Sequence, residues 1–120
     1  MSGTGLAKDT PAPPYYAVIF TSQRTEVDKG YGQMADRMVE LASSQPGFLG
    51  VESTRGEDGL GITVSYWQDE ASIKAWKANT QHQVAQQTGK KVWYADYMLR
   101  VAKVERAYSK AESDAAGVKG

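Results

Sequence analysis

The chain has 120 residues and a formal net charge of zero, from 14 basic and 14 acidic side chains. That length fits one domain, and the balanced charge argues against partners recruited by bulk charge, such as nucleic acid or an anionic membrane surface. Cysteine is absent, which excludes disulfides, thiolate nucleophiles and cysteine-ligated metals and suits the reducing cytoplasm, where we expect the protein to reside. No stretch has the apolar length of a transmembrane helix.

Both ends of the chain are expected to lie outside the folded domain, which we place at residues 15–108. Residues 1–14 are rich in Gly, Thr and Pro, and they end in a proline-rich run that disfavours helix, so we predict a flexible N-terminal arm. Residues 109–120 carry mostly small or charged side chains. We predict that this C-terminal segment is a disordered tail.

The first predicted strand begins at Tyr15 and is apolar at successive positions through Phe20, which would place apolar side chains on both faces of a sheet. A helix is predicted next, because apolar residues from Tyr31 to Leu41 recur at helical spacing while polar residues take the other side. The run Gln45-Pro46-Gly47 ends that helix.

Two further strands are predicted at residues 48–54 and 60–67, and the glycine-containing segment between them favours a hairpin. A second helix follows, with Asp69 as its N-cap. Its pattern is interrupted at Asn79 and Thr80, where Thr80 is expected to cap a continuation through Gln87. A final long strand is predicted from Val92 to Tyr108, again apolar on both faces.

The order strand, helix, strand, strand, helix, strand predicts a ferredoxin-like α+β fold, with a four-stranded antiparallel sheet and both helices on one face. The other face would be bare and apolar, and such a patch is larger than a soluble monomer tolerates. A second copy packed sheet against sheet would cover it, so we expect a homodimer that forms a dimeric α+β barrel. The side chains expected on that face are Val18 or Ile19, Phe20, Val64 or Tyr66, and Met98.

Several segments resemble the antibiotic-biosynthesis-monooxygenase-like family of dimeric α+β barrel proteins over about residues 15–108. Members of that family include cofactor-free oxygenases acting on polyketide phenols, quinol oxygenases, haem-degrading enzymes and small proteins without an assigned activity. The segments that carry the resemblance are Gln45-Pro46-Gly47-Phe48-Leu49-Gly50-Val51-Glu52-Ser53, Ile62-Thr63-Val64-Ser65-Tyr66-Trp67, Ala75-Trp76-Lys77, His82 and Trp93-Tyr94-Ala95-Asp96-Tyr97.

The haem-degrading branch is a poor match. Its helix tryptophan is matched by Trp76, but Gln86 stands where the iron-binding histidine is expected, and the first predicted strand lacks the asparagine of that branch. Resemblance to the cofactor-free oxygenases implies instead that Trp67, Arg100 and either Tyr66 or Tyr94 stand in for their Trp, Arg and Tyr. Thr63 or Ser65 occupies the neighbourhood of their Asn.

The leading hypothesis is therefore a monooxygenase without metal or flavin that acts on a planar aromatic molecule such as a phenol, quinol or polyketide. His82, whose side chain titrates near neutrality, is the candidate base, and Arg100 is the candidate stabiliser of the substrate anion. The candidate ligand-binding residues are Trp67, Trp76, Tyr66 and Tyr94. Each has a structural alternative: His82 can be a surface residue, and large aromatic residues at strand and helix positions are more often packing.

Two other classes of function stay open. The first is a non-catalytic dimeric protein that binds small molecules or is associated with stress. The second is single-stranded RNA binding through an aromatic sheet face, which the neutral charge and the expected dimer oppose. One histidine and scattered carboxylates supply no recognisable metal-ligand spacing, so no metal or other cofactor is expected.

Overall fold

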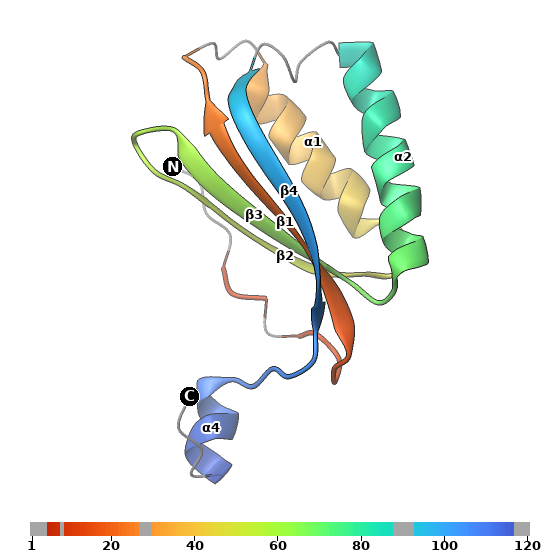
Figure 1. Ribbon diagram of the computed structural model, residues 1–120, viewed down its shortest axis with the longest axis vertical. Helices are drawn as coiled ribbons and strands as arrows, with labels where there is room; N and C mark the ends of the chain where they lie inside the picture. The colour runs from red at the N-terminus through yellow and green to blue at the C-terminus, as the bar shows by residue number, and fades with distance from the viewer. Residues whose placement is uncertain (1–4, 8, 27–29, 88–92, 117–120) are drawn as a thin grey trace.

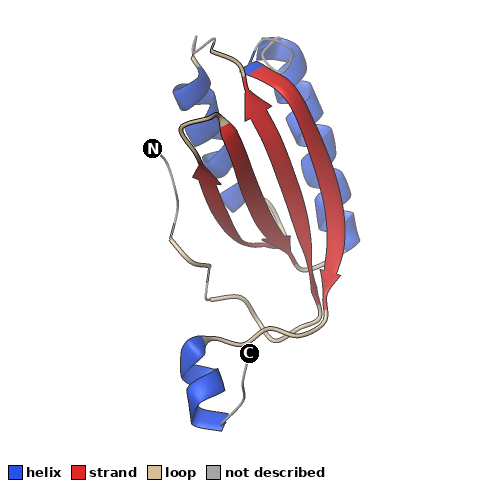
Figure 2. Cartoon of the chain, turned by 60° about the vertical axis from the view of Figure 1, so that its left-hand side comes forward, coloured by secondary structure: helices blue, strands red, loops and turns tan. Residues whose placement is uncertain are grey.

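A computed structural model describes residues 5–7, 9–26, 30–87 and 93–116 of the chain. Its central feature is a four-stranded antiparallel sheet in the order β2-β3-β1-β4, with α1 and α2 on one face (Figures 1 and 2). This confirms the predicted ferredoxin-like α+β fold. In chain order the elements are β1 (Tyr15–Arg24), α1 (Tyr31–Ser43), β2 (Phe48–Arg55), β3 (Leu60–Trp67), α2 (Glu70–Gln87), β4 (Tyr94–Val104) and α4 (Lys110–Ala116).

The register of β1 decides which side chains face the helices. Val18 lies opposite Ser65 of β3 and Val101 of β4, and it is buried in the core beneath the helices. Because successive side chains of a strand point to opposite faces, Ile19 lies on the other side of the sheet, which we call the open face. Phe20 shares the parity of Val18, so its expected place on the open face is wrong.

The hydrophobic core on the helix side is built around Trp67, which is fully buried. The Trp76 ring of α2 stacks on it with ring centroids 5.8 Å apart, and Phe48 meets it edge-on at 5.5 Å. The indole N–H of Trp67 donates a hydrogen bond to Ser65 Oγ at 2.9 Å, so its burial leaves no polar atom unsatisfied. The core thus joins β2, β3 and α2.

The second helix begins as predicted but is not interrupted. Asp69 caps it, because its Oδ1 accepts hydrogen bonds from the Ser72 hydroxyl at 2.7 Å and the Ser72 amide at 2.8 Å. Those two bonds lower the pKa of Asp69. The expected cap at Thr80 is wrong: its hydroxyl donates to the Lys77 carbonyl at 2.8 Å, a bond within the helix that requires no break.

The C-terminal part of the chain differs from expectation in two ways. β4 ends at Val104 rather than near Tyr108, so the last strand is shorter than predicted. Beyond it, α4 forms within the segment predicted to be disordered, and it lies apart from the sheet in Figure 1. A capping box explains this helix: the Ser109 amide donates to Glu112 Oε1 at 2.9 Å, and the Glu112 amide donates to Ser109 Oγ at 3.2 Å.

The described part of the N-terminal arm lies against the open face. The Ala7 amide donates to one oxygen of the Glu52 carboxylate at 2.9 Å, while the Tyr66 hydroxyl donates to the other oxygen at 2.6 Å. Burial, and then this bond to Glu52, raise the pKa of Tyr66 far above the usual tyrosine range. The described part of the arm therefore covers the open face around Tyr66 and Tyr15, whose hydroxyl accepts a hydrogen bond from Thr10.

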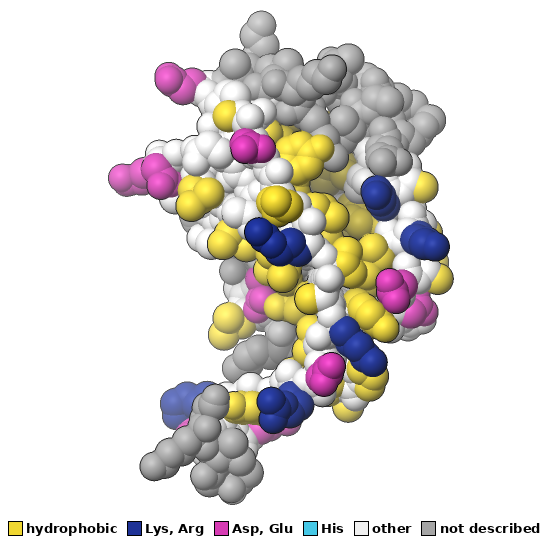
Figure 3. All heavy atoms as spheres, in the orientation of Figure 1, with side chains coloured by type: hydrophobic (Ala, Val, Ile, Leu, Met, Phe, Trp, Pro, Cys, Tyr) yellow, Lys and Arg dark blue, Asp and Glu magenta, His cyan; other side chains and the backbone are white. Residues whose placement is uncertain are grey.

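Part of the remaining open face is apolar and exposed. Ile62 and Met98 flank Thr21 in one cross-strand row, and their exposed fractions are 43% and 53%. Figure 3 shows apolar side chains gathered along the middle of the molecule, where β4 faces the viewer in Figure 1. Within the described ranges, no helix has the length and apolar character needed to cross a membrane.

Gly47 and Gly32 offer a matched test of the turn between α1 and β2. Gly47 has a φ of 85°, and a Cβ there would overlap the Ser72 hydroxyl, whereas a Cβ at Gly32 in α1 would meet nothing. We expect Gly47→Ala to lower the free energy of unfolding by about 1–2 kcal/mol or more, because L-residues are strained at that φ. Gly32→Ala should raise it by roughly 0.5–1 kcal/mol. Urea unfolding measures both, and equal effects would contradict this account.

Candidate functional site

Aromatic side chains cluster on the helix side of the sheet, where β1 ends and α1 begins. Phe20 of β1 contacts Tyr94 and Tyr97 of β4, with ring centroids 5.3 and 5.4 Å apart. Tyr31, the first residue of α1, meets Tyr94 at 5.9 Å and Trp93 at 5.8 Å, both edge-on. These five residues, which we call the aromatic cluster, join the first helix to both strands.

Two arginines approach the ring of Tyr31. The guanidinium carbon of Arg24 lies 3.6 Å from the ring centroid, and that of Arg55 lies 5.9 Å from it. Arg24 also donates from Nε to the Trp93 carbonyl at 3.2 Å. Guanidinium groups within about 6 Å of an aromatic centroid are attracted by the ring quadrupole. The Tyr31 ring therefore brings two positive charges to the edge of the aromatic cluster.

Arg55 is half-buried and hydrogen-bonded to neutral oxygens. Its Nη2 donates to Ser22 Oγ at 2.8 Å and to the Tyr31 hydroxyl at 3.4 Å, and its Nη1 donates to the carbonyls of Ser22 and Gly59. Its guanidinium lies over Gly61, where any Cβ would overlap it. Within the described ranges no carboxylate forms an ion pair with Arg55.

A chain of hydroxyl contacts links Arg55 to the aromatic cluster. The Tyr94 hydroxyl donates to the Tyr31 hydroxyl at 3.4 Å, and Tyr31 in turn accepts from Arg55. Burial is the largest influence on Tyr94 and raises its pKa above the usual tyrosine range, and the bond to Tyr31 acts in the same direction. The positive charges of Arg55 and Arg24 oppose this rise without cancelling it. Tyr94 is therefore a neutral hydroxyl donor at ordinary pH.

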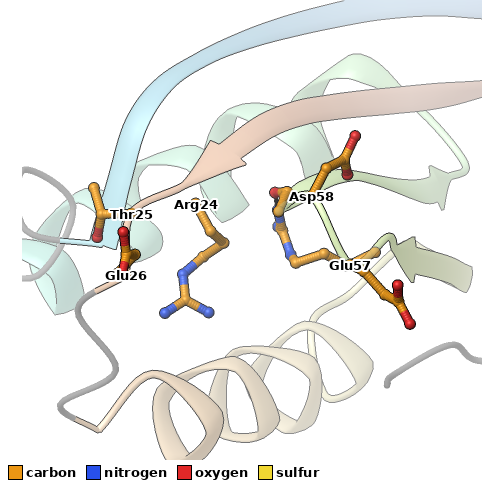
Figure 4. A pocket seen from close by; sticks show the side chains of 7 residues that line it. Arg24, Thr25, Glu26, Glu57 and Asp58 are labelled. Carbon is orange, nitrogen blue, oxygen red and sulfur yellow. Dashed lines mark hydrogen bonds between the residues drawn. The ribbon is translucent and has the colours of Figure 1, made fainter.

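A hollow of about 340 Å³ opens beside the two arginines (Figure 4). In Figure 4 the carboxylates of Glu57 and Asp58 point away from the guanidinium of Arg24. The residues that line the hollow are Arg24, Thr25, Glu26, Arg55, Glu57, Asp58 and Gly59. The acidic side chains are exposed and form the outer rim, while the arginines are half-buried. Among the residues that the structure describes, no group of His, Cys, Asp and Glu is arranged to hold a metal ion.

The structure places the predicted site residues in two groups. Trp67, Trp76 and Tyr94 lie on the helix side, where the two tryptophans have the contacts of core residues and Tyr94 belongs to the aromatic cluster. Tyr66 and Arg100 lie on the open face, opposite Ala17 and Ile19 respectively. His82 lies in α2, but its side chain is outside the described part of the structure.

Sequence reasoning missed three residues of the candidate site: Tyr31, Arg24 and Arg55. Tyr31 was assigned to the apolar stripe of a helix, and Arg55 was assigned to the connection of the hairpin. A usable signal was present in the hairpin register, because Arg55 pairs with Gly61 and a glycine opposite an arginine leaves room for the guanidinium. No local sequence pattern indicates that these three residues lie next to Tyr94.

Comparisons with known proteins agree with the fold. The model of the antibiotic biosynthesis monooxygenase family matches residues 14–88. An uncharacterized protein of Bacillus subtilis strain 168, YqjZ, is 60% identical over 97 residues, which are 81% of this chain and 85% of that protein.

Solved structures of low sequence identity share the architecture. A mutant of SnoaB, a cofactor-independent oxygenase from Streptomyces nogalater, is 10% identical with a TM-score of 0.66, over 80% of this chain and 98% of SnoaB. The protein PA3566 from Pseudomonas aeruginosa is 14% identical with a TM-score of 0.54, over 82% of this chain and 99% of its own.

The raised pKa of Tyr94 predicts how stability depends on pH. A folded-state pKa above the unfolded value contributes stability that is fully present below the unfolded pKa of about 10, and this contribution is lost as the pH rises through the folded value. The free energy of unfolding should therefore fall more steeply above pH 10 in the wild type than in Tyr94→Phe. Urea unfolding between pH 8 and 11 measures the two slopes, and parallel curves would refute this assignment.

Proposed function

Because the chain belongs to the antibiotic biosynthesis monooxygenase family, we propose that it is a monooxygenase that acts on a planar aromatic small molecule, of the phenol, quinol or polyketide class, without metal or flavin. The observation that carries this proposal is the aromatic cluster, in which flat side chains lie beside the hydroxyls of Tyr31 and Tyr94 and the charge of Arg55. Aromatic walls with a few convergent polar groups are typical of small-molecule sites.

In the proposed reaction the substrate supplies all the electrons. A phenol loses its proton to a base, and the resulting anion passes an electron to oxygen. A carbon–hydrogen bond of the ring then becomes a carbon–oxygen bond, and the O–O bond breaks. One oxygen atom ends in a quinone and the other in water, so a phenol and one O₂ give a quinone and one water. The protein's part is to bind the ring, accept the proton and stabilise the anion.

The residues of this proposal are those named from the sequence, with roles set by their position. His82 is the proposed base, and Trp76 and Tyr94 are proposed to line the ligand on the helix side, with Trp67 behind them. Arg100 and Tyr66 face the other side of the sheet. They therefore lie away from a ligand on the helix side, and their proposed role is in contacts with a second copy packed on the open face.

A homodimer is part of the proposal for that reason. The open face leaves Ile62 and Met98 exposed, and the helix side of β4 leaves Leu99 and Val101 about half exposed, at 48% and 49%. Several large exposed apolar side chains on one strand are unusual on a monomer and typical of an interaction surface. A second copy related by a two-fold axis would cover the open face with an identical surface.

A second candidate function, ligand binding without turnover, is favoured by one observation. Trp67 is completely buried and hydrogen-bonded within the core, so it is packed as a structural residue. A protein that keeps the aromatic cluster and lacks a working base would bind phenols without oxidising them.

Oxygen consumption tests the leading proposal. With a panel of hydroquinones and anthrone-like phenols, wild-type protein should consume oxygen, and His82→Ala should lower the rate by about 10²- to 10⁴-fold, because a positioned general base contributes that much. Lys74→Gln, an exposed position on α2, serves as the matched control and should keep the wild-type rate. Binding of the panel with no oxygen consumed by the wild type would support the carrier instead.

Light scattering on a size-exclusion column tests the dimer. The wild type should elute at twice its chain mass of 13.1 kDa, and Met98→Asp should dissociate it or precipitate it, because a carboxylate would be buried in an apolar interface. Val39→Asp, at an exposed position on α1, should leave the mass unchanged. A monodisperse wild-type monomer would remove the dimer from the proposal.

A further inference from the structure

We propose that Arg55 and Tyr31, with Arg24 beside them, form a binding site for the negatively charged end of a small aromatic acid. The inference deepens the proposed function, on which it rests for the aromatic body of the ligand. The negative charge of the ligand is inferred independently, from the arginines and hydroxyls of the site. The ligand class is a single aromatic ring that carries a carboxylate or phenolate group.

The first reason is the state of Arg55. Its side chain is half-buried, and all four of its hydrogen bonds end on neutral oxygens of Ser22, Gly59 and Tyr31. Within the described chain its Nε–H has no hydrogen-bond partner. A guanidinium removed from water is costly unless an anion accompanies it, and charge-assisted bonds to carboxylates are roughly twice as strong as neutral ones. Arg55 is thus a positive charge held in one position, and its Nε–H is the donor that a ligand could use.

The second reason is the hydroxyl of Tyr31. It accepts from Arg55 Nη2 and from the Tyr94 hydroxyl, both at 3.4 Å. A phenol oxygen that accepts two hydrogen bonds still carries its own hydrogen, and no acceptor for that hydrogen lies among the described residues. Tyr31 therefore offers one O–H donor beside the cation. A guanidinium and a phenol hydroxyl 3.4 Å apart are both donors of the kind that stabilises an oxyanion.

The third reason is the shape and charge of the hollow. Arg24 and Arg55 both line it and both lie against the Tyr31 ring. Of the acidic residues at the rim, Asp58 already accepts a hydrogen bond from the Leu60 amide at 3.0 Å, and it points away from Arg24 together with Glu57 in Figure 4. The three carboxylates of the lining, on Glu26, Glu57 and Asp58, are exposed and therefore screened by water and salt, whereas the two arginines are half-buried and screened less.

The size of the hollow sets the size of the ligand. A volume of about 340 Å³ is near the lower end of the range for small-molecule pockets. One ring with an acidic substituent suits that volume, and Arg24 and Arg55 line the hollow with guanidinium groups and aliphatic stems on which an aromatic ring can pack. Arg55 and Tyr31 would then orient the acidic end of the ligand. The Tyr94 hydroxyl would lie behind Tyr31, to which it donates a hydrogen bond.

A purely structural role for Arg55 is the competing explanation, because it ties β1 to the hairpin through Ser22 and Gly59. The experiment therefore needs two ligands of nearly the same shape, one with an anionic carboxylate and one with a neutral amide in its place. We propose to titrate the full-length protein with 4-hydroxybenzoate and with uncharged 4-hydroxybenzamide by calorimetry under nitrogen, so that no turnover takes place. The variants are Arg55→Gln, Tyr31→Phe and the control Arg37→Gln, which changes an exposed arginine of α1.

We expect the wild type to bind 4-hydroxybenzoate at least about 10-fold more tightly than the amide, since hydrogen bonds to a charged acceptor are roughly twice as strong as neutral ones. Arg55→Gln should abolish this preference. Tyr31→Phe keeps the ring beneath the arginines and removes only the hydroxyl, so it should weaken 4-hydroxybenzoate binding by about 10-fold and leave the amide less affected. Arg37→Gln should match the wild type for both compounds.

Two results would overturn the proposal: equal binding of the acid and the amide by the wild type, or unchanged acid binding in both Arg55→Gln and Tyr31→Phe. If Arg55→Gln does not fold, Tyr31→Phe alone decides. The same proteins in air separate this inference from the proposed function. A charge preference without oxygen consumption keeps the anion site and removes the oxygenase. Oxygen consumption that neither variant changes keeps the oxygenase and removes the site.

Discussion

The register of β1 between β3 and β4 is the constraint on which the rest of the structure depends. Because β1 is hydrogen-bonded along both edges, the face to which each of its side chains points also fixes the face of the paired residues in β3 and β4. The parity that buries Val18 under the helices also brings Phe20, Ser22 and Arg24 to the same side. A slip of one residue would exchange the two faces and scatter the core and the candidate site together. Stability and site geometry are therefore fixed by the same hydrogen bonds.

The hairpin of β2 and β3 shows how closely packing and charge are coupled in this protein. Gly61 has no side chain, so the guanidinium of Arg55 lies across it and reaches the buried Ser22 of β1. The same contact holds the positive charge against the Tyr31 ring at the start of α1. Arg55 contacts three elements, so its side chain is ordered in the absence of a ligand. A side chain that is ordered beforehand loses little conformational entropy when a ligand binds.

The sequence predicted the fold well and the candidate site poorly, for physical reasons that can be named. Helical spacing of apolar residues, the hairpin glycines and the Asp69 cap are local signals, so the order of elements and the sheet followed from them. Local signals did not show which residues of β1 face the helices. Apolar residues of β1 lie on both faces, so the sequence pattern cannot choose between Val18 and Ile19. Tyr31 and Tyr94 are 63 residues apart, and only the register of the finished sheet brings their hydroxyls together. The C-terminal helix was missed because its composition was weighed and its Ser109 and Glu112 capping box was not.

The position of β4 at the edge of the sheet has a consequence for motion. In the described sheet this strand pairs with β1 alone, the helices pack over β2 and β3, and its residues 95–103 are exposed. Segments with one paired edge and few buried contacts open at lower free energy than central strands, and their amides exchange hydrogen with solvent sooner. Tyr94 is the first residue of that strand, so opening from that end would also draw its ring away from Phe20 and Tyr31. Local unfolding of β4 and access of solvent to the aromatic cluster are in this sense one and the same event.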